Sequence, residues 1–230
     1  MSSDKPSDHP ESQQLPSTPE QEPQPSLQKF IVENLPTVAV AVLLAVGVRI
    51  FIAEPRYIPT TSMEPSLLVD DRLIIDKISL RWSKPKRGEI VVFNPPVNPV
   101  VPDASKVYIK RVIGVPGDRI SIGDNKVFVN DVPLNEPYIA APPAYTLPTQ
   151  DDALCTNCFK PSDVKSSNGR LYFTVPEGKY WVMGDNRNNS LDSHAWGFLP
   201  EENLVGKAVF RYWPLDNRAG FLNIPKTFTP

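Results

Sequence analysis

A serine and a lysine stand in sequence contexts that suit hydrolytic chemistry. Ser62 lies in residues 58–67 (IPTTSMEPSL), where the two prolines favour an irregular loop. Lys110 lies within an apolar run, residues 108–114 (YIKRVIG). A serine hydroxyl becomes a nucleophile when a neighbouring base takes its proton, and an unprotonated lysine can be that base. Each residue also has a simpler interpretation, a turn-closing serine and a lysine at the edge of a strand.

The alternation of an extended strand predicts where the Lys110 side chain lies. It places Lys110 with Tyr108 and Val112 on one face and Arg111 on the other, and both faces are mainly apolar. Burial disfavours the ammonium form. Lowering a lysine pKa from about 10.4 towards 7 or 8 costs about 4 kcal/mol, which a folded domain can supply. A buried Lys110 is therefore a candidate acceptor for the Ser62 proton.

A third segment, residues 183–193 (MGDNRNNSLDS), contains many polar turn formers and so is not an ordinary strand. By itself it is compatible with an exposed loop whose side chains cap the backbone. The three segments together resemble the conserved boxes of bacterial type I signal peptidases, over roughly residues 49–214. The resemblance implies a membrane-bound serine endopeptidase that removes N-terminal signal peptides from exported preproteins after a small-x-small motif. It implies Ser62 as nucleophile, Lys110 as general base and no cofactor or metal.

The same resemblance implies the residues that help the dyad. Ser190 would hydrogen-bond Lys110 and orient it. The hydroxyl of Thr60 and the backbone N–H of Ser62 would stabilise the oxyanion, which needs at least two donors. Extended segments beside Ser62 would bind the substrate as an added strand.

Charged residues near the boxes would support the site without reacting. The resemblance implies that Asp185 pairs with Arg111. Asp192 and Ser193 match the family's Asp-Ser-Arg, but the third residue here is His194. This departure removes the arginine that would pair with the aspartate in the family.

Two other functions are compatible with the sequence. His194 could act as the base of a Ser-His-Asp triad, oriented by Asp185 or Asp192, since His9 lies in the N-terminal tail. The chain could instead be a non-enzymatic single-pass membrane protein with a β ectodomain. The combination of Ser62 with a buried lysine argues against both.

The N-terminal part must place these residues relative to a membrane. Residues 1–34 are predicted to be a disordered polar tail, and residues 35–53 to be a transmembrane anchor. A buried core helix and a cleaved signal sequence are the alternatives; bulky Phe51 disfavours a cut after Ala53.

Orientation gives two conflicting indications. Lys29 lies before the apolar segment while Arg49, Arg56 and Arg72 lie at its other end or beyond it, which leans towards a cytoplasmic C-terminal domain. The resemblance implies the reverse: a cytoplasmic tail and a catalytic domain on the periplasmic, extracellular or lumenal side. We follow the resemblance, because a count of so few charges is weak.

Residues 54–230 are predicted to be a mainly β catalytic domain, with a variable inserted subdomain at about 123–170. The resemblance implies coiled antiparallel sheets with a partly barrel-like core and one N-terminal transmembrane helix. Turns are expected at residues 123–125 and 130–131. The predicted strands are residues 72–78, 89–93, 106–115, 119–122, 126–129, 171–175, 179–183 and 205–213.

Composition limits the partners. A net charge of -2 argues against nucleic acid, and the absence of a His-Glu-x-x-His pattern from the sequence argues against metalloprotease chemistry. We expect signal-peptide-bearing preproteins and the lipid bilayer as partners, and we expect the chain to be a monomer.

Cys155 and Cys158 either form a disulfide in an oxidising compartment or are two unpaired thiols.

Overall fold

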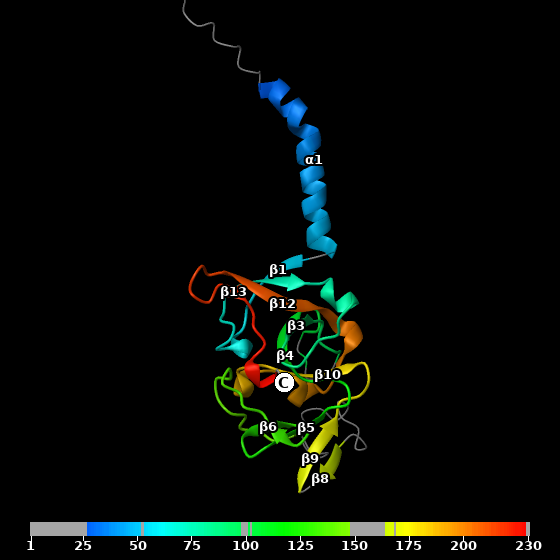
Figure 1. Cartoon of the computed structure of the whole chain (residues 1–230), viewed down its shortest axis with the longest axis vertical. Helices are drawn as coiled ribbons and strands as arrows, with labels where there is room; N and C mark the ends of the chain where they lie inside the picture. Colours follow the sequence, from blue (N-terminus) through cyan, green and yellow to red (C-terminus); the bar gives the residue numbers. More distant parts are fainter. Residues whose placement is uncertain are drawn as a thin grey trace, which may run out of the picture. The chain divides into compact units, whose positions relative to one another are not determined.

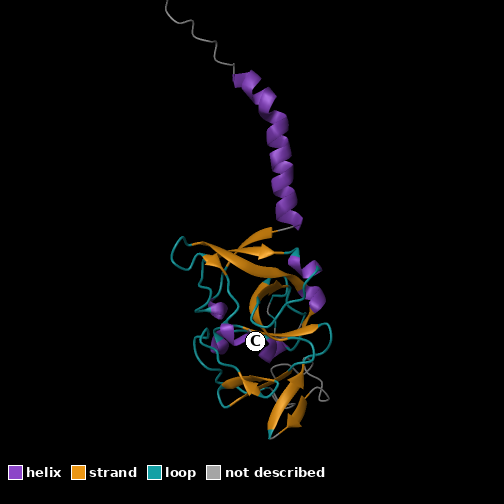
Figure 2. Ribbon diagram, viewed as in Figure 1, coloured by secondary structure: helices purple, strands orange, loops and turns teal. Residues whose placement is uncertain are grey.

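The computed structural model describes residues 27–51, 53–97, 101, 103–147, 164–167 and 169–228. Most of the predicted tail and both cysteines lie outside these residues. The described part of the catalytic region is built from antiparallel strands and a few short helices, so it is mainly β (Figure 2).

The N-terminal helix α1 covers Leu27–Phe51. It begins before the predicted anchor, so residues 27–34, expected in the tail, are helical. The helix is longer because apolar residues 30–32 extend the apolar run upstream of Pro36. Pro36 was expected at the start of the helix and lies inside it. Within the described residues, no helix has the length and hydropathy that crossing a bilayer requires.

The first sheet has eight antiparallel strands and carries Lys110, whereas Ser62 lies in a short helix outside it. Several of the strands are labelled in Figure 1. Neighbouring strands follow the order β1-β2-β12-β3-β4-β10-β11, with β13 paired to β12. Their bounds are β1 Ala53–Tyr57, β2 Arg72–Asp76, β3 Ile90–Phe93, β4 Tyr108–Gly114, β10 Lys179–Met183, β11 Leu199–Pro200, β12 Leu204–Trp213 and β13 Gly220–Phe221.

A second sheet of five antiparallel strands, in the order β7-β6-β5-β9-β8, is inserted in the chain between β4 and β10, which are neighbours in the first sheet. Its bounds are β5 Arg119–Gly123, β6 Lys126–Val129, β7 Val132–Pro133, β8 Val164–Ser167 and β9 Arg170–Thr174. Asp124 and Asn125 turn the chain between β5 and β6 with positive φ values of 53° and 56°, which asparagine and aspartate tolerate. Asn130 and Asp131 do the same before β7.

Short helices connect the strands. They are the 3₁₀ helices η1 Thr61–Met63, η2 Ser79–Arg81, η4 Arg187–Asn189, η5 Glu201–Asn203 and η6 Lys226–Phe228, and the α-helix α2 Ser193–Trp196. Two of them, η1 and η4, contact each other. They bring the loop of Ser62 against the polar third segment.

Candidate active site

Two buried side chains fix the loop that carries Ser62. Met63 and Leu67 are fully buried in an apolar cluster with Ile58 and Leu73. Because apolar anchors lie on its C-terminal side and Ile58 on its N-terminal side, the loop has little freedom. Ser62 is left at the edge of the cluster, with 8% of its surface exposed.

The lysine comes from strand β4, whose residues pair with β3. In this register Lys110 lies opposite Val91, and Arg111 lies opposite Ile90. The Lys110 Nζ donates a hydrogen bond to Ser62 Oγ at 2.8 Å and another to the carbonyl oxygen of Ile109 at 2.9 Å. The structure therefore brings together the two residues that the sequence singled out.

The surroundings of Lys110 lower the pKa of its amine. The residue is only 4% exposed. Burial lowers the pKa of Lys110 from 10.5 to about 8, while the charges of Asp192 and Asp185 raise it. No carboxylate pairs with Lys110 directly in the part of the chain that the structure describes. Lys110 consequently releases its proton at a lower pH than an ordinary lysine does.

Arg111, the next residue, points to the other face and has a carboxylate partner. Its Nε and Nη2 donate to the two oxygens of Asp185 at 2.8 and 2.6 Å, and its Nη1 donates to the Gly88 carbonyl at 2.7 Å. Tyr138 lies against the guanidinium, with the ring centroid 4.5 Å from Cζ. The pairing of Arg111 with Asp185 is the one that the resemblance implies.

The third segment packs directly on the Ser62 loop. The backbone N–H of Asn186 donates to the Ser62 carbonyl at 3.1 Å. Gly184 lies so close that a Cβ there would be 2.4 Å from the same carbonyl oxygen. Only glycine fits at this position. A glycine immediately after a buried strand often marks a close approach of the backbone, and this signal could have indicated the requirement.

Ser190 differs from its prediction. Its hydroxyl donates to Asp192 Oδ2 at 2.6 Å rather than to Lys110. The physical reason is that Asp192 is a buried carboxylate that must be satisfied by donors, and it also accepts from the backbone N–H of Gly184 at 2.8 Å. Among the described residues no hydrogen bond joins Ser190 to Lys110, and the charge of Asp192, which accepts from Ser190, acts on the pKa of Lys110.

His194 occupies the position where the resemblance implies an arginine. Its Nδ1 lies 2.8 Å from Asp192 Oδ1, and its ring stacks on Tyr145 at 4.1 Å. Burial opposes the ionisation of Asp192, but hydrogen bonds from His194, Gly184 and Ser190 hold its pKa below the usual value. Among the described residues no hydrogen bond joins His194 to Ser62, so a Ser-His-Asp triad does not assemble here.

The Thr60 side chain approaches the dyad from the solvent side. Its Oγ1 lies 3.2 Å from Ser62 Oγ. A cavity of about 340 Å³ opens beside this group, lined by residues 59–62, residues 106–110, Asn189 and Leu191. A loop that leads into η1 and a stretch that leads into β4 therefore face one open space beside the dyad, which suits a peptide in extended conformation.

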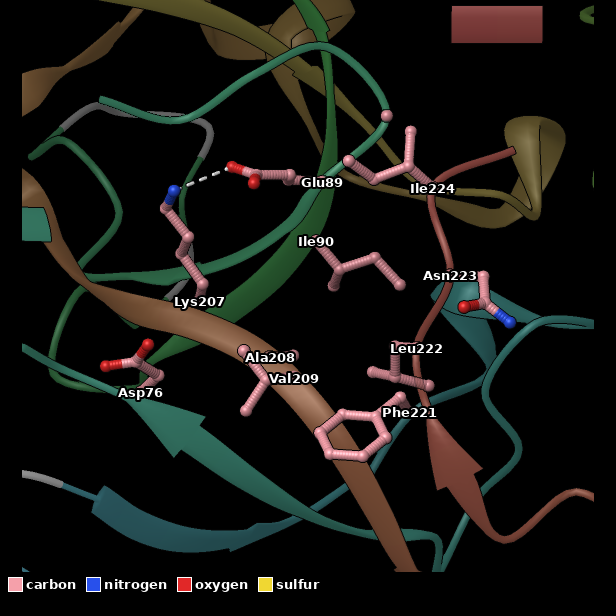
Figure 3. A pocket seen from close by; sticks show the side chains of 11 residues that line it. Asp76, Glu89, Ile90, Lys207, Ala208, Val209, Phe221, Leu222, Asn223 and Ile224 are labelled. Carbon is pink, nitrogen blue, oxygen red and sulfur yellow. Dashed lines mark ion pairs between the residues drawn. The ribbon is translucent and has the colours of Figure 1, made fainter. Parts of the chain in front are cut away.

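A second cavity, of about 400 Å³, is lined by none of the predicted site residues (Figure 3). It lies between β3, β12 and residues 221–224, with the ion pair of Lys207 and Glu89 at 2.9 Å on one side. Within the described part of the chain, no group of three His, Cys, Asp or Glu side chains could hold a metal ion.

A mainly β protein that buries a lysine against a serine has the arrangement of a serine hydrolase with a lysine base. Residues 31–213 match the family described as signal peptidase, peptidase S26. Three relatives agree in family. They are "Probable signal peptidase I-2" of Synechocystis sp. (48% identical over 81% of this chain and 74% of the relative), "Signal peptidase I" of Leptolyngbya laminosa (40% over 93% and 96%) and "Thylakoidal processing peptidase 1, chloroplastic" of Arabidopsis thaliana (37% over 76% and 46%). The chain belongs to the S26 signal peptidase family and is a hydrolase of that class.

Proposed function

We propose that this chain removes signal peptides from exported preproteins with Ser62 as the nucleophile and unprotonated Lys110 as the general base. The observation that carries the proposal is the 2.8 Å hydrogen bond between Lys110 Nζ and Ser62 Oγ in a buried setting. Family membership supplies the reaction class.

The reaction is an acyl transfer in two stages. Neutral Lys110 takes the Ser62 proton as Oγ attacks the scissile carbonyl, and the resulting ammonium returns the proton to the leaving amine. The products of this stage are the released mature protein and an ester between the signal peptide and Ser62. Lys110 then activates a water that hydrolyses the ester and restores both side chains.

The developing oxyanion needs donors on the Ser62 side of the substrate. We assign this role to the Thr60 hydroxyl and the Ser62 backbone N–H. The position of Thr60 Oγ1, 3.2 Å from Ser62 Oγ, supports the assignment. Thr60→Val should lower kcat far more than KM, because the hydroxyl acts on the transition state; a change in KM alone would argue against the role.

Substrate binding follows from the walls of the 340 Å³ cavity. Residues 59–61 and 106–109 are extended or irregular and offer backbone groups to a signal peptide lying between them. The space beside Ser62 would take small side chains at the first and third positions before the cut, as the small-x-small end of a signal peptide requires.

Membrane attachment completes the proposal. The part of residues 35–53 that lies in α1 would anchor the chain, since its described residues expose large apolar side chains such as Leu43 and Leu44 at 71% and 65%. The catalytic domain would lie on the outer or lumenal side. In sealed vesicles of known sidedness, an impermeant maleimide should label Cys155 and Cys158 from that side after reduction, whereas labelling from the cytoplasmic side alone would reverse the orientation.

The direct test uses a labelled preprotein and membranes that contain the full chain. Wild type should cleave it at one site after a small residue, and Ser62→Ala should not cleave it. His194→Ala, with its fold checked by circular dichroism, should retain far more activity than Ser62→Ala. Equal loss in both folded variants would favour a histidine base instead.

A further inference from the structure

The chain between β7 and the undescribed part of the insertion packs against the catalytic segments. We call residues 134–147 the strap and residues 184–194 the support loop. The Ala140 N–H donates to the Asp185 carbonyl at 3.1 Å, and the Ala144 N–H donates to Asn188 Oδ1 at 2.8 Å. Tyr145 of the strap also stacks on His194 of the support loop. A stretch that the sequence marked only as irregular is thus docked along the loop beneath the dyad.

The strongest contact between strap and support loop is a buried ion pair. Arg187 Nη1 and Nη2 donate to the two oxygens of Glu136 at 2.7 and 2.6 Å. The two side chains are 0% and 5% exposed. Burial opposes the charged form, yet Glu136 holds the pKa of Arg187 above its usual value. Removing either charge would leave the other buried without a partner.

Arg187 connects this ion pair to the dyad through Gly184. Its Nε donates to the Gly184 carbonyl at 3.0 Å. Gly184 in turn lies against the Ser62 carbonyl and Ser190 Oγ, where a Cβ would come within 2.4 and 2.2 Å. Direct contacts therefore connect Glu136 to Ser62. In the last of them, Gly184 is packed so tightly against the Ser62 carbonyl that neither can shift without moving the other.

We propose that Glu136 is a positioning residue for the reaction, which acts through Arg187 and Gly184 to hold Ser62 in line with Lys110. The inference rests on the proposed function. Glu136 lies outside the three boxes, in the inserted segment, and it does not line the cavity beside Ser62. Its loss therefore changes the alignment of the reacting atoms, while most of the wall of that cavity, residues 59–62 and 106–110, belongs to other segments of the chain.

The test compares Glu136→Gln with Glu136→Asp in the full-length, membrane-embedded chain. For Glu136→Gln, kcat per folded molecule should fall about 10- to 100-fold while KM changes less than about threefold, because small misplacements of reacting groups slow the chemical step. Glu136→Asp keeps the charge and should recover part of kcat. Asp124→Asn removes the exposed partner of Arg170 in the same inserted region and should leave both constants unchanged.

Folding is followed by thermal melts and near-ultraviolet circular dichroism, and wild type and Ser62→Ala are assayed beside the variants. If wild type cleaves and Ser62→Ala does not, the proposed function stands independently of the result at Glu136. Wild-type kcat per folded molecule in Glu136→Gln, or a change in KM alone, overturns the inference. If Glu136→Gln does not fold, Arg187→Lys is the deciding variant, because it keeps the positive charge but loses the Nε donor to Gly184. A wild-type kcat in this variant overturns the inference, and a reduced kcat supports it.

Discussion

The two faces of strand β4 bury consecutive cations in opposite ways. On one face, Arg111 shares two hydrogen bonds with the carboxylate of Asp185. On the other, Lys110 donates to a hydroxyl and a backbone carbonyl and lies 5.5 Å from the centroid of the Tyr108 ring, and no carboxylate among the described residues pairs with it. A buried cation with a carboxylate partner keeps its charge, whereas one without such a partner loses its proton more easily. The comparison supports the proposed roles, in which Arg111 is structural and Lys110 is the base.

The largest effect should follow from replacing the base. Lys110→Met has no amine, and Lys110→Arg has a guanidinium that does not deprotonate in proteins. Each should lower kcat/KM for preprotein cleavage by roughly a thousandfold or more, because serine without a base is a poor nucleophile. The assay is single-turnover cleavage with circular dichroism as the folding control. Substantial activity in folded Lys110→Arg would show that the lysine is not the base.

Breaking the ion pair on the other face should affect stability first. Asp185→Asn leaves the Arg111 guanidinium buried beside a neutral amide, so the free energy of unfolding should fall by about 3–5 kcal/mol. Urea denaturation of the full chain in detergent measures it. The matched control is Asp131→Asn, which removes the exposed partner of Arg119 and should cost less than about 1 kcal/mol. Similar losses in the two variants would contradict the distinction between the faces.

Lys110 itself should make stability depend on pH. The folded-state pKa is lowered from 10.5 to about 8, so between these pH values the unfolded chain holds a proton that the folded chain has released. Wild-type stability should therefore gain up to about 3 kcal/mol from this group as pH rises through that window. Lys110→Met lacks this titrating group and does not bury an ammonium at pH 7. Its free energy of unfolding should therefore exceed that of wild type at pH 7, and the difference should shrink towards pH 10.5. A difference that is constant with pH would mean that the lysine pKa is unshifted.

The smallest effect should follow from removing the charge of Asp192, the carboxylate that accepts from Ser190. The charge of Asp192 raises the pKa of Lys110 against the effect of burial. Asp192→Asn should therefore move the rising limb of the pH profile of kcat/KM to lower pH, in addition to any loss of rate. Ser193→Ala alters the neighbouring hydroxyl and leaves the charge in place, so its profile should keep the wild-type midpoint. A shift to higher pH in Asp192→Asn would contradict this electrostatic role.

The sequence could predict elements whose pattern is local. All eight predicted strands are present, because each has enough apolar residues to reveal its period. The strand β1 was missed because Pro55 interrupts it, and β7 and β11 are two-residue pairings that each include a proline. The contact between Ser62 and Lys110 was predictable from two local sequence contexts and a family resemblance.

Partners that depend on tertiary packing were not predictable. Ser190 turns to Asp192 rather than Lys110, because the support loop brings a buried carboxylate within its reach. Glu136 and Arg187 are 51 positions apart in the chain, and nothing in either local sequence indicates that they meet. The partners of buried charges are set by the tertiary fold rather than by the local sequence.

The central claim is that the pKa of Lys110 is lowered to about 8 while its amine contacts Ser62. The most direct measurement is an NMR titration of wild-type protein labelled with ¹³C and ¹⁵N in lysine, with the Lys110 side-chain signal assigned by its absence in Lys110→Met. The account predicts a titration midpoint near pH 8, matching the rising limb of cleavage activity. A Lys110 signal that stays protonated up to pH 10, while the enzyme is fully active at pH 8, would contradict it.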